Sequence, residues 1–308
     1  MNLRTIQILA LVGLMSGAPA ALADRYTPID FPGAIATDAS GINSSGEIVG
    51  AYNDSTGAQH GFRLNEGAFA TIDVPGASRT VPVSINSHGD VAGFFQDPSP
   101  SNRWHGFVLS NGHFSVQDYP GATTGTFTLG ISANGTLVGE FKTGQAFGQL
   151  GFAWILRHGQ YSQLMPPGAV QAFATSVNSR GDVVGRLIDG AGQQTAWKMD
   201  RKGTYTVFQF PGASLTNARN INSKGEVVGV YRLGGVNHGF ILPKNDFANF
   251  TTIDFPGAAS TRALGINSRG DIVGTYDLAG VAGLGHSFLL SRDDDDDDDH
   301  GDDDNGHE

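Results

Sequence analysis

Four histidines occupy the same place in a recurring pattern and are the first candidates for chemistry. His60, His105 and His238 each precede Gly-Phe, and His286 precedes Ser-Phe. Imidazole nitrogens bind transition metals at ~2 Å, so the ligands of one ion must converge on one point. Histidines at one register of separate repeats are too far apart to do so. We therefore expect each ring to form hydrogen bonds within its own repeat.

An aspartate recurs in the phrase Asp-x-Pro-Gly and is the second candidate. It stands at Asp30, Asp73, Asp118 and Asp254. Met165 and Gln209 take its place in two further copies, which weakens a functional role for the position. Because an Asp side chain can accept a hydrogen bond from the backbone two residues on, we expect these residues to cap turns.

The pair Arg219-Asn220 departs from the pattern of the other copies. Elsewhere a small residue stands directly before the repeated Ile or Val of the innermost strand, namely Gly41, Ser84, Gly130, Ser176 and Gly265. An arginine at the mouth of a central channel would bind an anion or a carboxylate. The alternative is an arginine that lies over the edge of its own repeat with its guanidinium in solvent.

Further ligand-binding candidates lie where the copies differ, because repeat scaffolds place function in variable loops on one face. These are Asp97, Arg103 and Trp104 in one loop, and Arg79 and Arg262 at crossings between repeats. No catalytic residue and no metal ligand is predicted. The chain has no Gly-x-Ser-x-Gly, no His-Glu-x-x-His and no cysteine. Catalysis by residues distant in the sequence stays open.

All of these residues belong to one motif that is repeated along the chain. Pro-Gly-Ala recurs six times at intervals of 43 to 47 residues, which is typical of propeller blades. The glycines of this phrase are Gly33, Gly76, Gly121, Gly168, Gly212 and Gly257. An aromatic residue also recurs and is expected to form the core between blades. Its positions are Phe62, Phe107, Phe152, Trp197, Phe240 and Phe288.

Each copy contains four short strand signals separated by turn residues. In the first copy these are residues 38–43, 47–52, 61–64 and 69–74. Gly46 lies where a hairpin turn needs positive φ, and Gly50 indicates a bulge or a close backbone approach inside a strand. Four antiparallel strands per copy predict an all-β fold, a six-bladed β-propeller. An open right-handed β-solenoid is the alternative by repeat length.

The two ends of the repeat region predict closure of the ring. The segment from Tyr26 to Gly33 matches the fourth strand of a copy, and the last copy stops after its third strand, which ends at Leu290. We expect the N-terminal strand to complete the last blade, which leaves no open interface between first and last blades.

The phrases His-Gly-Phe, Ile-Asp-x-Pro-Gly-Ala and Gly-Ile-Asn-Ser-x-Gly resemble the bacterial extracellular HAF-repeat family over residues Tyr26 to Arg292. The resemblance implies an exported repeat protein and brings no catalytic residues. The third copy departs most, with Leu150 where His is expected and Ser132 in place of Asn.

Composition and the two ends of the chain predict where the protein is located and how its domains are bounded. Residues 1–23 resemble a secretory signal peptide with an Ala-Leu-Ala cleavage site, so we expect the propeller domain to span residues 24–292. Residues 293–308 form an Asp-rich tail, expected to be disordered, with ten Asp, one Glu and no Lys or Arg. Without this tail the chain has 19 acidic and 19 basic residues, and such a neutral balance argues against nucleic-acid binding.

The predicted function is that of an exported, non-catalytic binding or interaction propeller, secreted or periplasmic, monomeric and without a membrane span. Its partner is an extracellular or periplasmic ligand or protein of unknown identity. No cofactor is expected beyond weak divalent cation binding by the tail. The alternative is an extracytoplasmic hydrolase or lyase acting on a glycan or lactone at the channel mouth. An enzyme would gather ionisable groups from different blades around one cavity.

Overall fold

The computed structural model describes residues 26–144, 150–280 and 285–292. The predicted signal peptide and the Asp-rich tail lie outside these residues. Every regular element that is described is a β-strand. None of the described residues forms a helix with the length and apolar character needed to cross a membrane. The strands are β1 Tyr26–Ile29, β2 Ala36–Ile42, β3 Ile48–Asn53, β4 Gln59–Asn65, β5 Ala68–Ile72, β6 Arg79–Ile85, β7 Val91–Gln96, β8 Trp104–Ser110, β9 His113–Val116, β10 Gly125–Ile131, β11 Leu137–Thr143, β12 Leu150–Arg157, β13 Gln160–Leu164, β14 Ala169–Val177, β15 Val183–Asp189, β16 Gln194–Met199, β17 Tyr205–Phe208, β18 Leu215–Ile221, β19 Val227–Leu233, β20 Val236–Leu242, β21 Thr251–Ile253, β22 Ala258–Ile266, β23 Ile272–Leu278 and β24 His286–Leu290.

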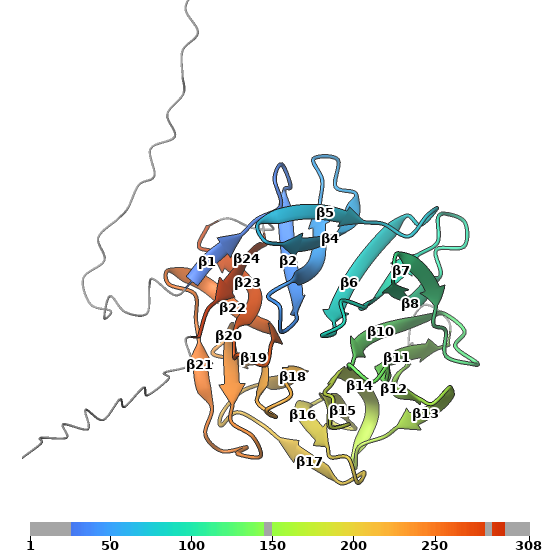
Figure 1. Cartoon of the computed structure of the whole chain (residues 1–308). Helices are drawn as coiled ribbons and strands as arrows, with labels where there is room; N and C mark the ends of the chain where they lie inside the picture. The colour runs from blue at the N-terminus through green and yellow to red at the C-terminus, as the bar shows by residue number, and fades with distance from the viewer. Residues whose placement is uncertain (1–25, 145–149, 281–284, 293–308) are drawn as a thin grey trace, which may run out of the picture.

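Consecutive strands pair antiparallel in four-stranded groups, one group for each copy of the motif. The first group is β2-β3-β4-β5, and the same order repeats along the chain. The groups are arranged around a common centre, with the first strand of each group innermost (Figure 1). Short parallel contacts join β8 to β10 and β16 to β18, so sheets of four and eight strands result and none of them closes on itself. This arrangement is a β-propeller.

Local residue chemistry shapes the strand pairs as predicted. Gly46 adopts φ +85° in the β2–β3 turn. The side-chain oxygen of Asn43 accepts hydrogen bonds from the backbone N–H groups of Ser45 and Glu47 and so holds that turn. At Gly50 a Cβ atom would lie 2.0 Å from the carbonyl oxygen of Asp38. The predicted close backbone approach is therefore confirmed, and a register shift in β2 lies directly opposite it.

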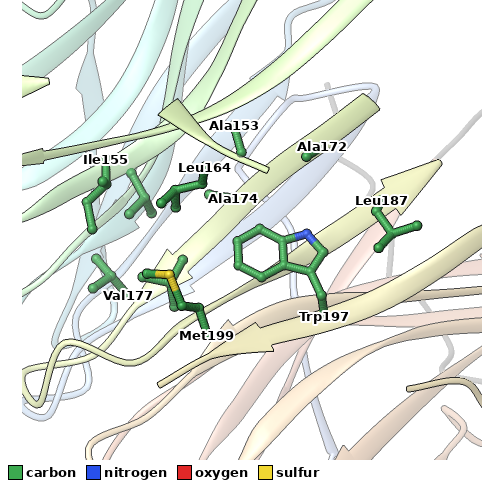
Figure 2. Close-up of a cluster of buried hydrophobic side chains, with 11 residues drawn as sticks. Ala153, Ile155, Leu164, Ala172, Ala174, Val177, Leu187, Trp197 and Met199 are labelled. Carbon is green, nitrogen blue, oxygen red and sulfur yellow. The ribbon is translucent and has the colours of Figure 1, made fainter. Parts of the chain in front are cut away.

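The repeated aromatic residue forms a core between neighbouring groups. Phe62, Phe107, Trp197, Phe240 and Phe288 are fully buried, and each lies opposite the repeated glycine of the preceding strand. Figure 2 shows Trp197 among aliphatic side chains from both adjoining groups, including Ile155 of β12 and Val177 of β14.

The prediction for the third copy was wrong by two residues. Trp154, not Phe152, lies opposite Gly139 and is fully buried. Phe152 instead faces Phe141, the place that pairs with histidine in other copies, so Phe152 and not Leu150 replaces the histidine. Side chains two apart in a strand share a face, so spacing alone did not distinguish the two aromatic residues.

The two ends of the repeat region lie side by side. β1 pairs antiparallel with β24, with Tyr26 opposite Leu290 and Pro28 opposite Phe288. The ring of Tyr26 packs against Phe255 and Phe288 with centroid separations of 5.3 and 5.5 Å. The predicted pairing of the N-terminal segment with the last copy is therefore present.

Asparagine side chains link neighbouring groups near the centre, at the ends of the innermost strands. In each link the amide nitrogen donates to a main-chain carbonyl of the next copy. The links are Asn43 to Asn86, Asn86 to Ser132, Asn178 to Asn222, Asn222 to Asn267 and Asn267 to Asn43, with lengths of 2.9 to 3.3 Å. Between Ser132 and Asn178 no such bond exists among the described residues. The hydroxyl of Ser132 donates within its own turn, to the carbonyl of Thr136 and to Asn134.

Candidate functional site

A central cavity of about 310 Å³ lies among the innermost strands. Every group contributes to its lining, and two of the predicted ligand-binding residues, Arg219 and Asn220, belong to it. The lining residues are Asp38 and Ser40 of β2, Val81 and Val83 of β6, Phe94 of β7, Phe127 and Leu129 of β10, Glu140 of β11, Phe173 and Thr175 of β14, Arg186 of β15, Arg219 and Asn220 of β18, and Leu264 of β22.

Strand geometry explains why these positions meet. Asp38 and Ser40 lie four and two residues before the repeated Ile42, and the same two places recur in the other innermost strands. Alternate side chains of a strand point to one side, so residues two apart both face the centre. Five of the copies place small or apolar residues such as Ser40, Val83 or Leu129 at the second place, whereas β18 places Arg219 there.

Arg219 is a cation without a fixed partner. Among the described residues its guanidinium makes no hydrogen bond and no ion pair, and its side chain is exposed because it borders the open cavity. Desolvation by the surrounding protein lowers the pKa of Arg219, and the like charge of Arg186 lowers it further. The negative charge of Asp38 opposes the shift. Arginine nevertheless stays protonated at neutral pH. Its five N–H donors are thus available to a ligand.

Two carboxylates border the same cavity from other copies. Desolvation by the surrounding protein raises the pKa of Asp38, although the charge of Arg219 and a hydrogen bond from Ser40 oppose the change. Burial likewise raises the pKa of Glu140, against the charges of Lys142 and Arg186. Lys142 Nζ lies 3.6 Å from Glu140 Oε1. Both acids therefore hold a proton more readily than a carboxyl in water.

Arg186 is the second cavity cation, and it is held in place. Its guanidinium stacks over the ring of Phe173 at 3.9 Å from the centroid and donates to the side chain of Gln194. Burial lowers the pKa of Arg186, opposed by Glu140. The cavity thus combines aromatic surface with two cations and two carboxylates from four different copies. Such a site can bind a small charged ligand, and its acids could also transfer protons.

The other predicted residues do not join the central cavity. Arg262 pairs with Asp277 at 3.0 Å and lines a neighbouring cavity of about 210 Å³, which shares Asp38 with the central one. Arg103 and Trp104 line a separate cavity of about 440 Å³. The guanidinium of Arg103 donates to the carbonyl of Ala122.

Asp97 and Arg79 have no place in these cavities. The carboxylate of Asp97 accepts a hydrogen bond from Ser101 and lies 3.2 Å from His105 Nε2, so it holds its own loop. Arg79 is exposed at the start of β6. The structure therefore separates the seven predicted residues into a central site and peripheral positions.

The repeated histidines bond within their own groups, as predicted. His60 Nδ1 lies 2.8 Å from Asp73 Oδ2, and His105 Nδ1 lies 2.7 Å from Asp118 Oδ2. The expectation that the repeated aspartates cap turns was wrong, because their carboxylates pair with the histidines. The turn is held instead by a threonine, as when Thr80 Oγ1 accepts the N–H of Val74. Among the described residues no three His, Asp or Glu side chains are placed to hold a metal ion.

Sequence reasoning missed Asp38, Glu140 and Arg186. A signal for two of them exists in the repeats, because Glu140 and Arg186 directly follow the repeated glycine of the second strand. The other copies have Ala51, Phe94, Val230 and Thr275 there. Charged residues at a position that is otherwise neutral could have indicated the site.

Comparisons with known proteins identify the fold. No family model and no curated protein sequence matches this chain, so the resemblance to HAF repeats stays a prediction. Among solved structures, the chain is similar to an arginine-to-alanine variant of AofleA from Arthrobotrys oligospora (14% identity, 87% of each chain, TM-score 0.55). It is also similar to TolB from Acinetobacter baumannii (15% identity, 81% of this chain and 64% of that chain, TM-score 0.53). A third similar structure is the β-propeller domain of the Trilobed protease from Pyrococcus furiosus (8% identity, 81% of that chain and 83% of this one, TM-score 0.51). At these identities the likeness concerns the fold alone, which is a β-propeller.

Proposed function

We propose that this protein is an exported six-bladed β-propeller that binds a small ligand in its central cavity without transforming it. The observation that carries the proposal is Arg219, a charged side chain that borders a cavity and has no protein partner among the described residues. An arginine fork in such a place recognises a carboxylate or another small anion.

The ring is proposed to be complete, with β1 as the fourth strand of the last blade. The pairing of β1 with β24 and the amide link from Asn267 to Asn43 both join the last copy to the first. We also propose that the protein is monomeric and secreted or periplasmic. Mass measurement of the exported protein should give a chain that begins at Asp24.

The cavity supports a ligand with two unlike parts. Phe94, Val83 and Leu129 are partly exposed and offer apolar surface for one part of a ligand. Arg219 and Asn220 offer donors for an anionic part. The volume of about 310 Å³ is at the lower end of ordinary small-molecule sites. A small organic carboxylate with an apolar or ring portion fits this lining best.

A binding screen with matched variants tests the proposal. The mature protein is titrated calorimetrically with a panel of aliphatic and aromatic carboxylates, beside neutral glycans. Arg219→Ala should weaken carboxylate binding by ~10- to 100-fold, the value of a charge-assisted hydrogen bond. Arg79→Ala removes an exposed arginine outside the cavity and should leave affinity unchanged. Equal affinity of both variants would contradict the proposal.

A second candidate function is a hydrolase or lyase acting on a glycan or lactone at the channel mouth. It is favoured by the presence of Asp38 and Glu140, acids with raised pKa, beside Arg186 and Arg219. Turnover assays with lactones and glycans distinguish the candidates. An enzyme should lose turnover in Asp38→Asn or Glu140→Gln while ligand still binds. A binding module should show no turnover in any variant.

A further inference from the structure

A cleft of about 400 Å³ on the turn face of the fourth and fifth groups is strongly basic. It shares no residue with the central cavity. We call it the basic cleft, and it is lined by Arg180, Asp182, Lys198, Asp200, Arg201, Lys202, Lys244 and Asn245. Five cations therefore face two carboxylates.

The two carboxylates are already engaged by the protein. Asp182 Oδ2 lies 3.6 Å from Arg180 Nε and 3.9 Å from the buried ammonium of Lys198. Asp200 accepts the backbone N–H groups of Lys202 and Thr204 and so holds its own turn. Two carboxylates cannot neutralise five cations, so the cleft keeps a net positive charge.

The rim of the cleft consists of cations without a fixed partner. Arg201, Lys202 and Lys244 are exposed, and within the described part of the chain they make no ion pair and no side-chain hydrogen bond. Lys198 forms the floor, where it is only 5% exposed and donates to Asn245 Oδ1 at 2.7 Å. A buried ammonium beneath exposed cations makes the cleft attractive to a polyanion.

The chain itself carries a polyanion that directly follows Arg292, the last residue that the structure describes. Residues 293–308 contain ten Asp and one Glu without any Lys or Arg. The residue before them, Arg292, lies with its Nη1 atom 3.4 Å from Glu226 Oε1. Gly225 is the neighbour of Glu226, and a Cβ atom added to it would lie 2.4 Å from Arg180 Nη2 and 3.0 Å from Lys244 Cγ. Both of these side chains line the cleft. Sixteen residues can span roughly 50 Å when extended, so the cleft is well within reach.

We propose that the basic cleft binds the acidic segment 293–308 of the same chain. Covalent attachment gives the segment a high effective concentration, so weak charge pairs suffice to hold it. The attraction is between exposed charges and is therefore weakened by salt. The bound segment keeps external polyanions out of the cleft.

Carbodiimide cross-linking of the full chain tests this contact, because the reagent joins carboxylates directly to amines in contact with them. The chain has five lysines, of which Lys202 and Lys244 line the rim of the cleft. Lys142 lines a different cavity near Arg103 and serves as the internal control. At low salt, mass spectrometry should find the segment joined to Lys202 and Lys244 within monomers, with a several-fold loss at ~1 M salt. Equal cross-linking to Lys142, or cross-links only between molecules, would overturn the proposal.

A second measurement does not depend on cross-linking chemistry. Replacement of Asp293–Asp299 by Asn changes only residues outside the described fold. This variant should bind a labelled seven-aspartate peptide at least tenfold more tightly than the native chain, because its cleft is no longer occupied. Adding Lys202→Gln and Lys244→Gln should abolish that binding, whereas adding Lys142→Gln should not. Equal peptide affinity of native and Asn-substituted chains would refute the proposal.

Discussion

Asn267→Ser tests whether the amide links near the centre hold neighbouring copies together. The change copies what the third copy already has, because Ser132 supports its turn by accepting the N–H of Thr136 yet makes no link to the next copy. The turn should survive in the variant. The bond from the last copy to Asn43 should not.

The expected loss in the free energy of unfolding follows from the hydrogen bonds that the amide nitrogen of Asn267 makes. Asn267 Nδ2 donates to the carbonyl of Asn43 at 3.2 Å and to Asp271 Oδ2 at 2.8 Å, and the side chain is buried. A neutral hydrogen bond contributes about 1 kcal/mol and one to a charged group about 1.5 kcal/mol or more. We expect the free energy of unfolding to fall by about 2–3 kcal/mol, and Tm to fall by roughly 5–10 °C.

Urea unfolding followed by tryptophan fluorescence measures the change, with Ser132→Asn as the converse variant. That substitution should supply the missing link to Asn178 and stabilise the protein by about 1 kcal/mol. The two sites lie in different copies and share no partner, so the double variant should be additive. A loss below about 0.5 kcal/mol for Asn267→Ser would refute the view that the links stabilise the packing of neighbouring copies.

Three further predictions concern closure, pH and cations. Deletion of Tyr26 to Gly33 removes β1, exposes the edge of β24 and uncovers Phe288, so Tm by calorimetry should fall markedly; an unchanged Tm would contradict ring closure. Desolvation raises the pKa of Asp38, so the folded chain holds the proton of this carboxyl more tightly than the unfolded chain does. The resulting contribution to stability is present below pH ~4 and is lost as pH rises through the folded pKa. Asp38→Asn should remove that loss, which urea unfolding of both proteins from pH 4 to 8 measures. If the free energy of unfolding changes with pH in the same way in the variant and in the native chain, the pKa shift is contradicted. Calorimetric titration with Ca²⁺ should show weak binding that disappears when Asp293–Asp299 become Asn, and equal heats in both proteins would exclude the acidic segment as the binding site.

Much of the fold could be predicted because every copy has the same turn and strand residues at the same positions. Glycines such as Gly46 and Gly50 have conformations or close contacts that other residues tolerate poorly, so their recurrence indicates turns and strand pairs. The pairing of β1 with β24 also followed from the repeat, because the first segment matches a strand that the last copy lacks. The misplacement of Phe152 shows the limit, since an aromatic residue two positions away satisfies the same pattern.

The site was predicted only in part because its residues come from different copies and meet only when these copies pack around the centre. Arg219 stood out within its own copy, as a charge where other copies are small or apolar. Asp38, Glu140 and Arg186 come from three other copies, and only the packing of the groups brings them to one cavity. A hydrogen bond of His60 within its own group was predicted, but its partner Asp73 was not, because Asp73 lies 13 residues away in the sequence and only strand pairing brings it close.

The junction between the third and fourth copies differs in kind from the others. It lacks the amide link, yet it contains the cluster of Figure 2, whose 11 buried apolar residues outnumber those of any other cluster in the described chain. The stabilisation that buried apolar contacts provide becomes weaker on cooling. Hydrogen bonds do not have this temperature dependence. We therefore expect the contacts between the third and fourth copies to weaken more on cooling than those at the other junctions, and amide hydrogen exchange along β12 and β14 to accelerate first.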